Sequence, residues 1–175
     1  MSTNTAINMQ TVGVTQALTR KKFTWSNNYY VGSQNSPGIH GERNYFDTAL
    51  LLTPIKQFSA YVNVDYGRQQ ASESDAKQWW GIAAAARWQI TKRFAVSPRL
   101  EYFDDSDGFT TGKPQKLHEV TFTAEYKLLD GLLTRGEYRR DDSNVAYFDR
   151  GGASGSSKSQ STVTLGLIAF FPIKH

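Results

Sequence analysis

The sequence lacks several patterns that would define other classes of protein. It contains no cysteine, which excludes disulfides, thiolate metal sites and cysteine nucleophiles. No stretch approaches the roughly 18 to 20 consecutive apolar residues of a membrane-spanning helix, and the mean hydropathy is −0.52. The polar start, Met1-Ser-Thr-Asn-Thr, has no apolar segment of a secretory signal, so an exported protein would be a mature or shortened chain here. The net charge of +4 comes from scattered basic residues, so nucleic-acid binding is not predicted.

What the sequence does contain is a regular alternation of apolar and polar residues. In 78–103, Trp80 and Trp88 fall on one parity, and Ala83 and Arg87 fall on the other. A period of two, interrupted by a short polar turn, predicts strand, turn, strand. Aromatic residues close the apolar face at both ends, as expected of a face that contacts lipid between two headgroup levels.

The same period predicts further strands along the chain. They are expected at 7–18, 23–31, 44–52, 58–67, 79–90, 94–103, 117–128, 132–139 and 161–171. Pro54 is expected to end the third of them. Longer loops are expected at 32–42, 69–77, 104–116 and 141–158, with short turns elsewhere. Long loops on one rim and short turns on the other are typical of outer-membrane barrels.

The hairpin around Asp130-Gly131 allows a prediction of register. A loop with an odd number of residues, such as 129–131, keeps the charges of the two strands on one face. That register sets Glu125 opposite Arg135 and Thr123 opposite Glu137.

Two β architectures fit this alternation, and they differ in which face is enclosed. A soluble calyx of the lipocalin kind would hold the apolar residues inside, whereas a membrane barrel turns them toward lipid. Small residues share the polar parity with long charged side chains, and acids and bases are mixed on adjoining strands, as a polar lumen requires. We therefore expect an all-β, antiparallel up-and-down transmembrane β-barrel, with 8 to 10 strands in this chain.

This orientation assigns residues to two sites. The candidate lumen or constriction residues are Asp65, Arg87, Arg99, Glu101, Glu119, Glu125, Arg135, Glu137 and Arg139. The candidate lipid and interface girdle is Phe58, Tyr66, Trp80, Trp88, Phe94, Tyr102, Phe122, Tyr126 and Phe171. The lumen charges fit either a charged constriction that filters solutes or an internal salt-bridge ladder.

Four segments resemble a known family: FSAYVNVDYGRQ, WWGIAAAARWQITKRFAVSPRLEYFDD, HEVTFTAEYKLLDGLLTRGEYRRD and STVTLGLIAFF. They look like the C-terminal half of the β-barrel porins of Gram-negative outer membranes, OmpL-like group, over about residues 44–171. The resemblance implies an outer-membrane pore whose final strand ends in an aromatic residue. Phe171 matches that feature, although residues 172–175 follow it.

We expect one β-barrel domain over residues 1–175. It divides into a weak first strand or arm at 1–22, amphipathic strands at 23–171 and a tail at 172–175. Nine strands is an odd number, whereas bacterial single-chain barrels normally have an even one. The chain is therefore either the C-terminal part of a larger barrel or a closed barrel of eight strands with an arm or plug.

Two further features of the sequence are candidates for metal binding or catalysis. Asp104-Asp105-Ser106-Asp107-Gly108 could hold calcium, but Gln115 stands where an EF-hand loop needs an acid, which favours simple turn chemistry. His40, His118 and His175 have no paired acid or base at a legible spacing, so no enzyme, metal site or cofactor is expected.

The expected function is passive diffusion of small hydrophilic solutes or ions through a polar charged lumen. The alternatives are a filled barrel that serves as an anchor or adhesion scaffold, with loops 104–116 and 141–158 as its working surface, or a soluble carrier. Expected partners are outer-membrane lipid, lipopolysaccharide and small solutes, and a homo-oligomer is left open.

Overall fold

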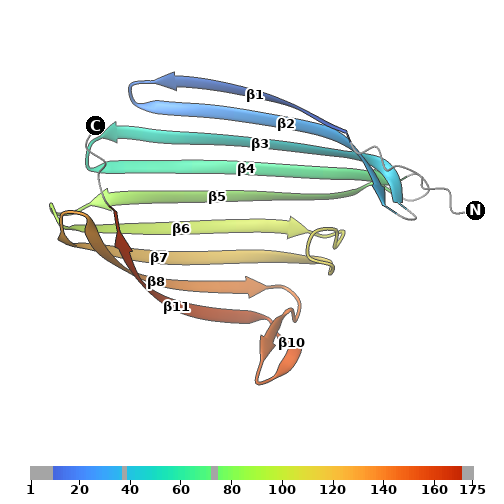
Figure 1. Cartoon of the computed structure of the whole chain (residues 1–175). Coiled ribbons are helices and arrows are strands. Elements are labelled where there is room, and N and C mark those ends of the chain that lie inside the picture. The colour runs from blue at the N-terminus through green and yellow to red at the C-terminus, as the bar shows by residue number, and fades with distance from the viewer. Residues whose placement is uncertain (1–9, 37–38, 72–74, 171–175) are drawn as a thin grey trace, which may run out of the picture.

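Strands make up most of the described residues in a computed structural model that describes residues 10–36, 39–71 and 75–170 (Figure 1). The strands are β1 Thr11–Arg20, β2 Phe23–Ser36, β3 Ile39–Ile55, β4 Phe58–Ala71, β5 Lys77–Gln89, β6 Phe94–Asp105, β7 Gln115–Leu129, β8 Leu132–Ser143, β9 Phe148–Arg150, β10 Ala153–Ser157 and β11 Ser159–Ala169. Within these ranges no helix is long and apolar enough to cross a membrane.

The main sheet is antiparallel and follows chain order, β1 to β8 and then β11. Only β9 and β10 leave this order, and they form a small hairpin of their own between β8 and β11. Figure 1 shows the short turns at the left rim, and the loop after β6 and the β9–β10 hairpin at the right rim. The predicted up-and-down topology is therefore confirmed.

The register between β7 and β8 is also the predicted one. Glu125 lies opposite Arg135, and Thr123 lies opposite Glu137. The closing loop differs from the expectation, because the strands end at a two-residue turn, Asp130-Gly131, and a register shift follows Lys127. Gly131 has a φ of +86°, the left-handed conformation that such a turn requires.

Several predicted loop boundaries are wrong. The segment 32–42 is mostly strand, since β2 and β3 pair as far as Ser36 and Ile39. Pro54 does not end β3, which runs to Ile55 with a register irregularity after Leu52. A polar, glycine-containing stretch can stay in a ladder because backbone hydrogen bonds, and not side chains, hold the two strands together. The second connection is thus not a long loop.

The two later loops are shorter than expected as well. The loop after β6 covers 106–114, inside the predicted 104–116. The segment 141–158 is not an unstructured loop, because it contains the end of β8 and the β9–β10 hairpin.

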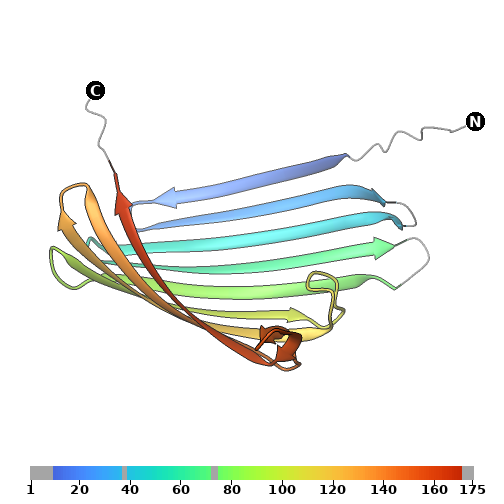
Figure 2. The same cartoon turned by 60° about the horizontal axis from the view of Figure 1, so that its bottom comes forward.

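The nine-stranded sheet curves into an open trough (Figure 2), and β1 and β11 are its two edges. β1 pairs with β2 over its whole length, from Thr11 to Arg20, so it belongs to the sheet and is not a separate arm. Rising by about 3.4 Å per residue, strands of this length can cross the hydrocarbon layer, which takes about 9 to 11 tilted residues.

The apolar face is exposed along its whole length. Val62 is 40%, Ile82 39%, Leu100 58% and Phe122 50% exposed. In the described part of the chain, the only buried apolar side chains are those of two alanines, Ala83 and Ala95, and Phe148. A lipocalin-like arrangement would gather the large apolar residues in an enclosed core, so that alternative is wrong.

Candidate functional site

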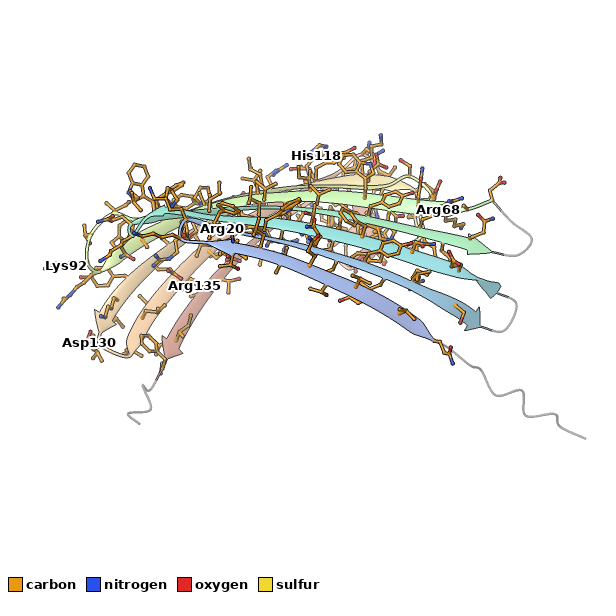
Figure 3. The ribbon with its side chains drawn as sticks, turned by 90° about the horizontal axis from the view of Figure 1, so that it is seen from above. Arg20, Arg68, Lys92, His118, Asp130 and Arg135 are labelled. Carbon is orange, nitrogen blue, oxygen red and sulfur yellow. The ribbon has the colours of Figure 1, made fainter. Side chains whose placement is uncertain are left out.

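The concave face of the sheet carries the charged residues that the sequence assigns to a lumen. Figure 3 shows Arg135 on the inner side of the curve and His118 on the outer side. Cross-strand pairing places all nine candidates on the same face as Arg135: Asp65 on β4, Arg87 on β5, Arg99 and Glu101 on β6, Glu119 and Glu125 on β7, and Arg135, Glu137 and Arg139 on β8.

One ion-pair cluster is centred on Glu125. Its carboxylate lies 3.1 Å from the guanidinium of Arg87 and 2.5 Å from that of Arg135. Arg87 also donates to the side-chain oxygen of Gln89 at 2.9 Å. A single acid therefore serves two bases, which come from β5 and β8 on either side of it.

A second cluster is centred on Glu119. The Arg139 guanidinium lies 2.7 Å from this carboxylate, and the Arg99 guanidinium lies 3.7 Å from it. Arg139 also pairs with Asp141 at 2.8 Å, and Arg99 pairs with Glu101. The second cluster thus carries one more acid than base, the reverse of the first.

In both clusters the acids lie against the wall and the arginines project from it. The side chains of Glu119 and Glu125 are 6% and 14% exposed, whereas the four arginine side chains are 39% to 45% exposed. The guanidinium groups therefore project farther from the concave face than the carboxylates do. Glu137 differs from the acids of the two clusters, because it accepts a hydrogen bond from Thr123 at 3.0 Å and forms no ion pair within the described ranges.

Asp65 lies in a different part of the wall, away from these arginines. It is directly opposite Asp47 of β3 and accepts a hydrogen bond of 2.7 Å from the Tyr45 hydroxyl. Asn63 and Asn28 each donate to Asp47 at 2.6 Å. Amide and hydroxyl donors, not cations, stabilise this pair of carboxylates.

The loop 106–114 is tied to the end of β6 by Asp105, which is fully buried. One carboxylate oxygen accepts the N–H of Phe109 at 2.8 Å. The other accepts the N–H groups of Thr110 and Thr111, at 3.0 and 2.7 Å, and the Thr111 hydroxyl at 2.8 Å. A carboxylate satisfied by four donors of one loop fixes its shape.

This loop reaches across the inner face of the sheet. It leaves the rim at the right end of β6 in Figure 2. The ring of Phe109 lies 5.0 Å from the guanidinium of Arg43, which belongs to β3, three strands away. At its other side, Asp107 accepts the N–H of Gln78 on β5 at 2.8 Å. The loop therefore narrows the trough near the rim that lies opposite the short turns.

A row of aromatic rings crosses the inner face at this level. Tyr30, Tyr45, Trp79 and Phe103 come from β2, β3, β5 and β6. Their ring centroids are separated by 6.2, 5.8 and 5.5 Å in that order. These distances are within the range in which aromatic rings attract each other.

Three of these rings lie directly opposite a glycine. Tyr30 pairs with Gly13, Trp79 with Gly67, and Phe103 with Gly81. A Cβ at Gly13 or Gly67 would overlap the partner's ring, and one at Gly81 would lie 3.2 Å from Phe103. The glycines let the rings lie across the neighbouring strand, as in the aromatic rescue of strand glycines.

The outer face carries the aromatic residues expected at the membrane interfaces, in two bands. Phe58, Trp88, Phe94 and Tyr126 lie near the short turns, and Tyr66, Trp80 and Tyr102 lie near the opposite rim. The two bands are eight residues apart on β4, which is about 26 Å along the strand and about 20 Å in height at the usual tilt.

Two girdle candidates do not lie in these bands. Phe122 lies between them, opposite Pro98, and Phe171 lies outside the described residues. The height between the bands is about 5 Å less than the apolar belt of about 25 Å that outer-membrane barrels show.

The sequence as a whole matches the model of the family described as "Putative beta-barrel porin-2, OmpL-like" over residues 3–171. The chain belongs to this family. Family membership, together with the exposed apolar face, makes it a β-barrel protein of the bacterial outer membrane. No curated protein sequence matches the chain.

Solved structures of outer-membrane proteins share the fold. The anion-selective porin from Comamonas acidovorans superposes with a TM-score of 0.76 at 13% identity, covering 91% of this chain and 49% of that one. OmpT, an outer membrane protein of Vibrio cholerae, gives 0.68 at 13% identity, covering 93% and 56%. A NanC porin structure gives 0.61 at 16% identity, covering 94% and 80%. This chain thus spans about half the length of the first two.

Of the three histidines, His118 is the one whose side chain the structure describes. His118 packs its ring 5.0 Å from that of Tyr102 on the outer face. The side chain of His40 and all of His175 lie outside what the structure describes. Across residues 10–36, 39–71 and 75–170, no three His, Asp or Glu side chains gather as metal ligands.

Sequence reasoning missed the inner aromatic row, Arg43 and the role of Asp105. It placed aromatic residues at the lipid face, although Trp79 and Phe103 fall on the polar parity of their strands. A usable signal was available: an aromatic residue on the polar parity whose cross-strand partner is glycine. For Asp105 the signal was weaker, since several acids of the same turn are equivalent in sequence.

Proposed function

We propose that this chain forms part of the wall of a water-filled outer-membrane pore, through which small hydrophilic solutes and ions diffuse passively, and that it catalyses no reaction. One observation carries the proposal: guanidinium groups project from the concave face while the apolar side chains cover the convex one. In a barrel wall that distribution gives a hydrated lumen and a lipid-facing exterior.

The open sheet cannot be the complete barrel in a membrane. β1 and β11 are edges, and unpaired backbone N–H and C=O groups cannot face hydrocarbon. We propose that this nine-stranded sheet forms one section of a barrel wall, and that further strands complete the barrel. Those strands come from a longer polypeptide or from a second copy of this chain.

The mass of the detergent-solubilised protein distinguishes the two sources of strands. Light scattering coupled to size exclusion gives one polypeptide per particle if a single chain closes the barrel. It gives a homo-oligomer if copies pair through their edges. In either case the outer surface contacts lipid and lipopolysaccharide.

A filled barrel that anchors or adheres is the second candidate, because all four candidate lumen arginines have acidic partners. A salt-bridge ladder of this kind could close a narrow barrel. Single-channel recording in planar bilayers separates the candidates. A pore gives steady, ohmic current steps in potassium chloride, whereas a filled barrel inserted with the same efficiency gives none.

A further inference from the structure

A cavity of about 520 Å³ lies on the inner face, at the level of the aromatic row. Three strands and the inward-folded loop line it, through Arg43 and Tyr45 of β3, Gly67 of β4, Trp79 of β5, and Phe109 and Thr110 of the loop. A volume of this size is typical of sites for small molecules.

Flat aromatic faces provide one wall of the cavity. Trp79 lies across Gly67, where a side chain would displace its indole. Tyr45 packs beside it, with ring centroids 5.8 Å apart, and the Tyr45 hydroxyl is held by Asp65. Contacts with the strands of the wall thus hold both rings in place, so that they offer a preorganised surface to a ring-shaped solute.

Arg43 supplies a positive charge that has no counter-ion among the described residues. Its guanidinium donates twice to the side-chain oxygen of Gln69, at 3.0 and 2.7 Å, and lies over Phe109 at 5.0 Å. Gln69 is neutral and only 5% exposed, so it orients the guanidinium without neutralising it. Arg43 forms no ion pair with any residue that the structure describes, unlike the arginines of β5, β6 and β8.

The aromatic wall and the Arg43 guanidinium line the same cavity, so one solute can contact both. An uncompensated guanidinium prefers a carboxylate or phosphate, which it binds with charge-assisted hydrogen bonds. Aromatic faces prefer a flat or apolar ring surface. The rest of the lumen wall offers no comparable combination among the described residues, since its arginines share their charge with nearby acids.

We propose that this cavity is a binding site for anionic solutes that carry a ring, with the ring against Trp79 and Tyr45 and the anionic group on Arg43. The inference rests on the proposed function, because the cavity opens on the path that a solute would take through the pore. It names the class of solute that the pore retains during passage: cyclic carboxylates, whether the ring is aromatic or a sugar.

Calorimetric titration of the detergent-solubilised protein tests the site without requiring conduction. Four probes separate the two contributions: benzoate and glucuronate carry a ring and a charge, acetate carries only the charge, and glucose carries only the ring. The site is supported if benzoate, glucuronate or both bind at least tenfold more tightly than acetate and glucose do. Which of the two cyclic acids binds then shows whether the preferred ring is aromatic or a sugar. Equal binding of acetate or glucose, or no binding of either cyclic acid, overturns it.

Matched variants locate the binding on the molecule. Arg43→Gln and Trp79→Leu should each weaken binding of the cyclic acid by about tenfold or more, the loss expected for one charge-assisted hydrogen bond or one stacked ring. Arg140→Gln and Trp80→Leu make the same changes on the outer face and should leave affinity unchanged. Unchanged binding in both inner variants overturns the site.

Failure of the site and failure of the pore give different results. A protein that conducts potassium chloride but binds no cyclic acid refutes the site alone. A protein that binds the cyclic acid with the expected variant pattern but passes no current refutes the pore alone.

Discussion

Replacing Asp105 by asparagine should release loop 106–114 from the inner face of the sheet. Three of the four hydrogen bonds that Asp105 accepts go to one oxygen, from the N–H groups of Thr110 and Thr111 and from the Thr111 hydroxyl. Asparagine has one acceptor oxygen in place of two, so that even in its better orientation, with the amide oxygen toward Thr110 and Thr111, its NH2 group faces the N–H of Phe109.

The size of the effect follows from this count. Losing one charge-assisted hydrogen bond of about 1.5 kcal/mol at a fully buried site, and weakening the other three by about 0.5 kcal/mol each as the charge is removed, lowers the free energy of loop opening by about 3 kcal/mol. Each 1.4 kcal/mol is a factor of ten, so the open loop becomes about a hundredfold more populated. The sheet itself should unfold at the same temperature, since no ladder hydrogen bond changes.

A spin label at Thr110→Cys reports the release, because the chain has no other cysteine. The label should be immobile in the parent protein and mobile with Asp105→Asn, and single-channel current should become noisier. Asp130→Asn is the control: this acid lies in a turn on the opposite rim, is 97% exposed, and has Lys127 as its one ion-pair partner among the described residues. Equal label mobility and equal current noise in the Asp105 and Asp130 variants would refute the reasoning.

Three further outcomes are expected. Gly67→Ala should destabilise the protein by about 1 to 3 kcal/mol and shift the fluorescence of Trp79. The control is Gly136→Ala, whose Cβ would lie 3.6 Å from its nearest neighbour, and it should change neither property. Equal melting temperatures of the two variants would contradict this prediction. Glu125→Gln leaves two arginines without their acid and should move the reversal potential in a potassium chloride gradient toward anion preference, and a cation shift contradicts it. A backbone N–H and a serine hydroxyl hold the pKa of Asp149 below its usual range. The hydrogen bond from the Gly155 N–H to Asp149 therefore stabilises the β9–β10 hairpin at neutral pH and is lost as the pH falls through that lowered pKa. Hydrogen exchange of the Gly155 amide measures this loss. Protection of that amide that persists in strong acid contradicts the prediction.

Much of the fold could be predicted from the sequence because a period of two fixes which face each residue occupies. The alternation around Glu125 and Arg135 even gave the pairing register of β7 and β8, since a slip of one residue would turn their charges toward lipid. The lengths of β2 and β3 could not be predicted, because beyond the hydrocarbon layer both faces of a strand meet water and apolar and polar residues no longer need to alternate. Polar residues of 32–42 therefore look like a loop while their backbones remain paired.

The candidate site was predictable only in part. The charged residues of the concave face follow from parity, but which acid pairs with which arginine depends on side-chain reach, as at Glu125, which pairs with Arg87 across the intervening strand β6. The position of Phe109 over Arg43 depends on how a loop folds, and no local pattern encodes it. The inner rings needed knowledge of cross-strand partners, which exists only once the register is known.

The most direct test of the membrane orientation compares Ala84→Cys with Ala85→Cys in lipid. These adjacent alanines of β5 lie on opposite faces, opposite Leu100 and Arg99 respectively. Spin labels at the two positions are exposed to molecular oxygen, which concentrates in lipid, and to a water-soluble nickel complex. The label at position 84 should collide mainly with oxygen and the label at 85 mainly with nickel. The opposite pattern would show that the charged face meets the lipid and would contradict the pore.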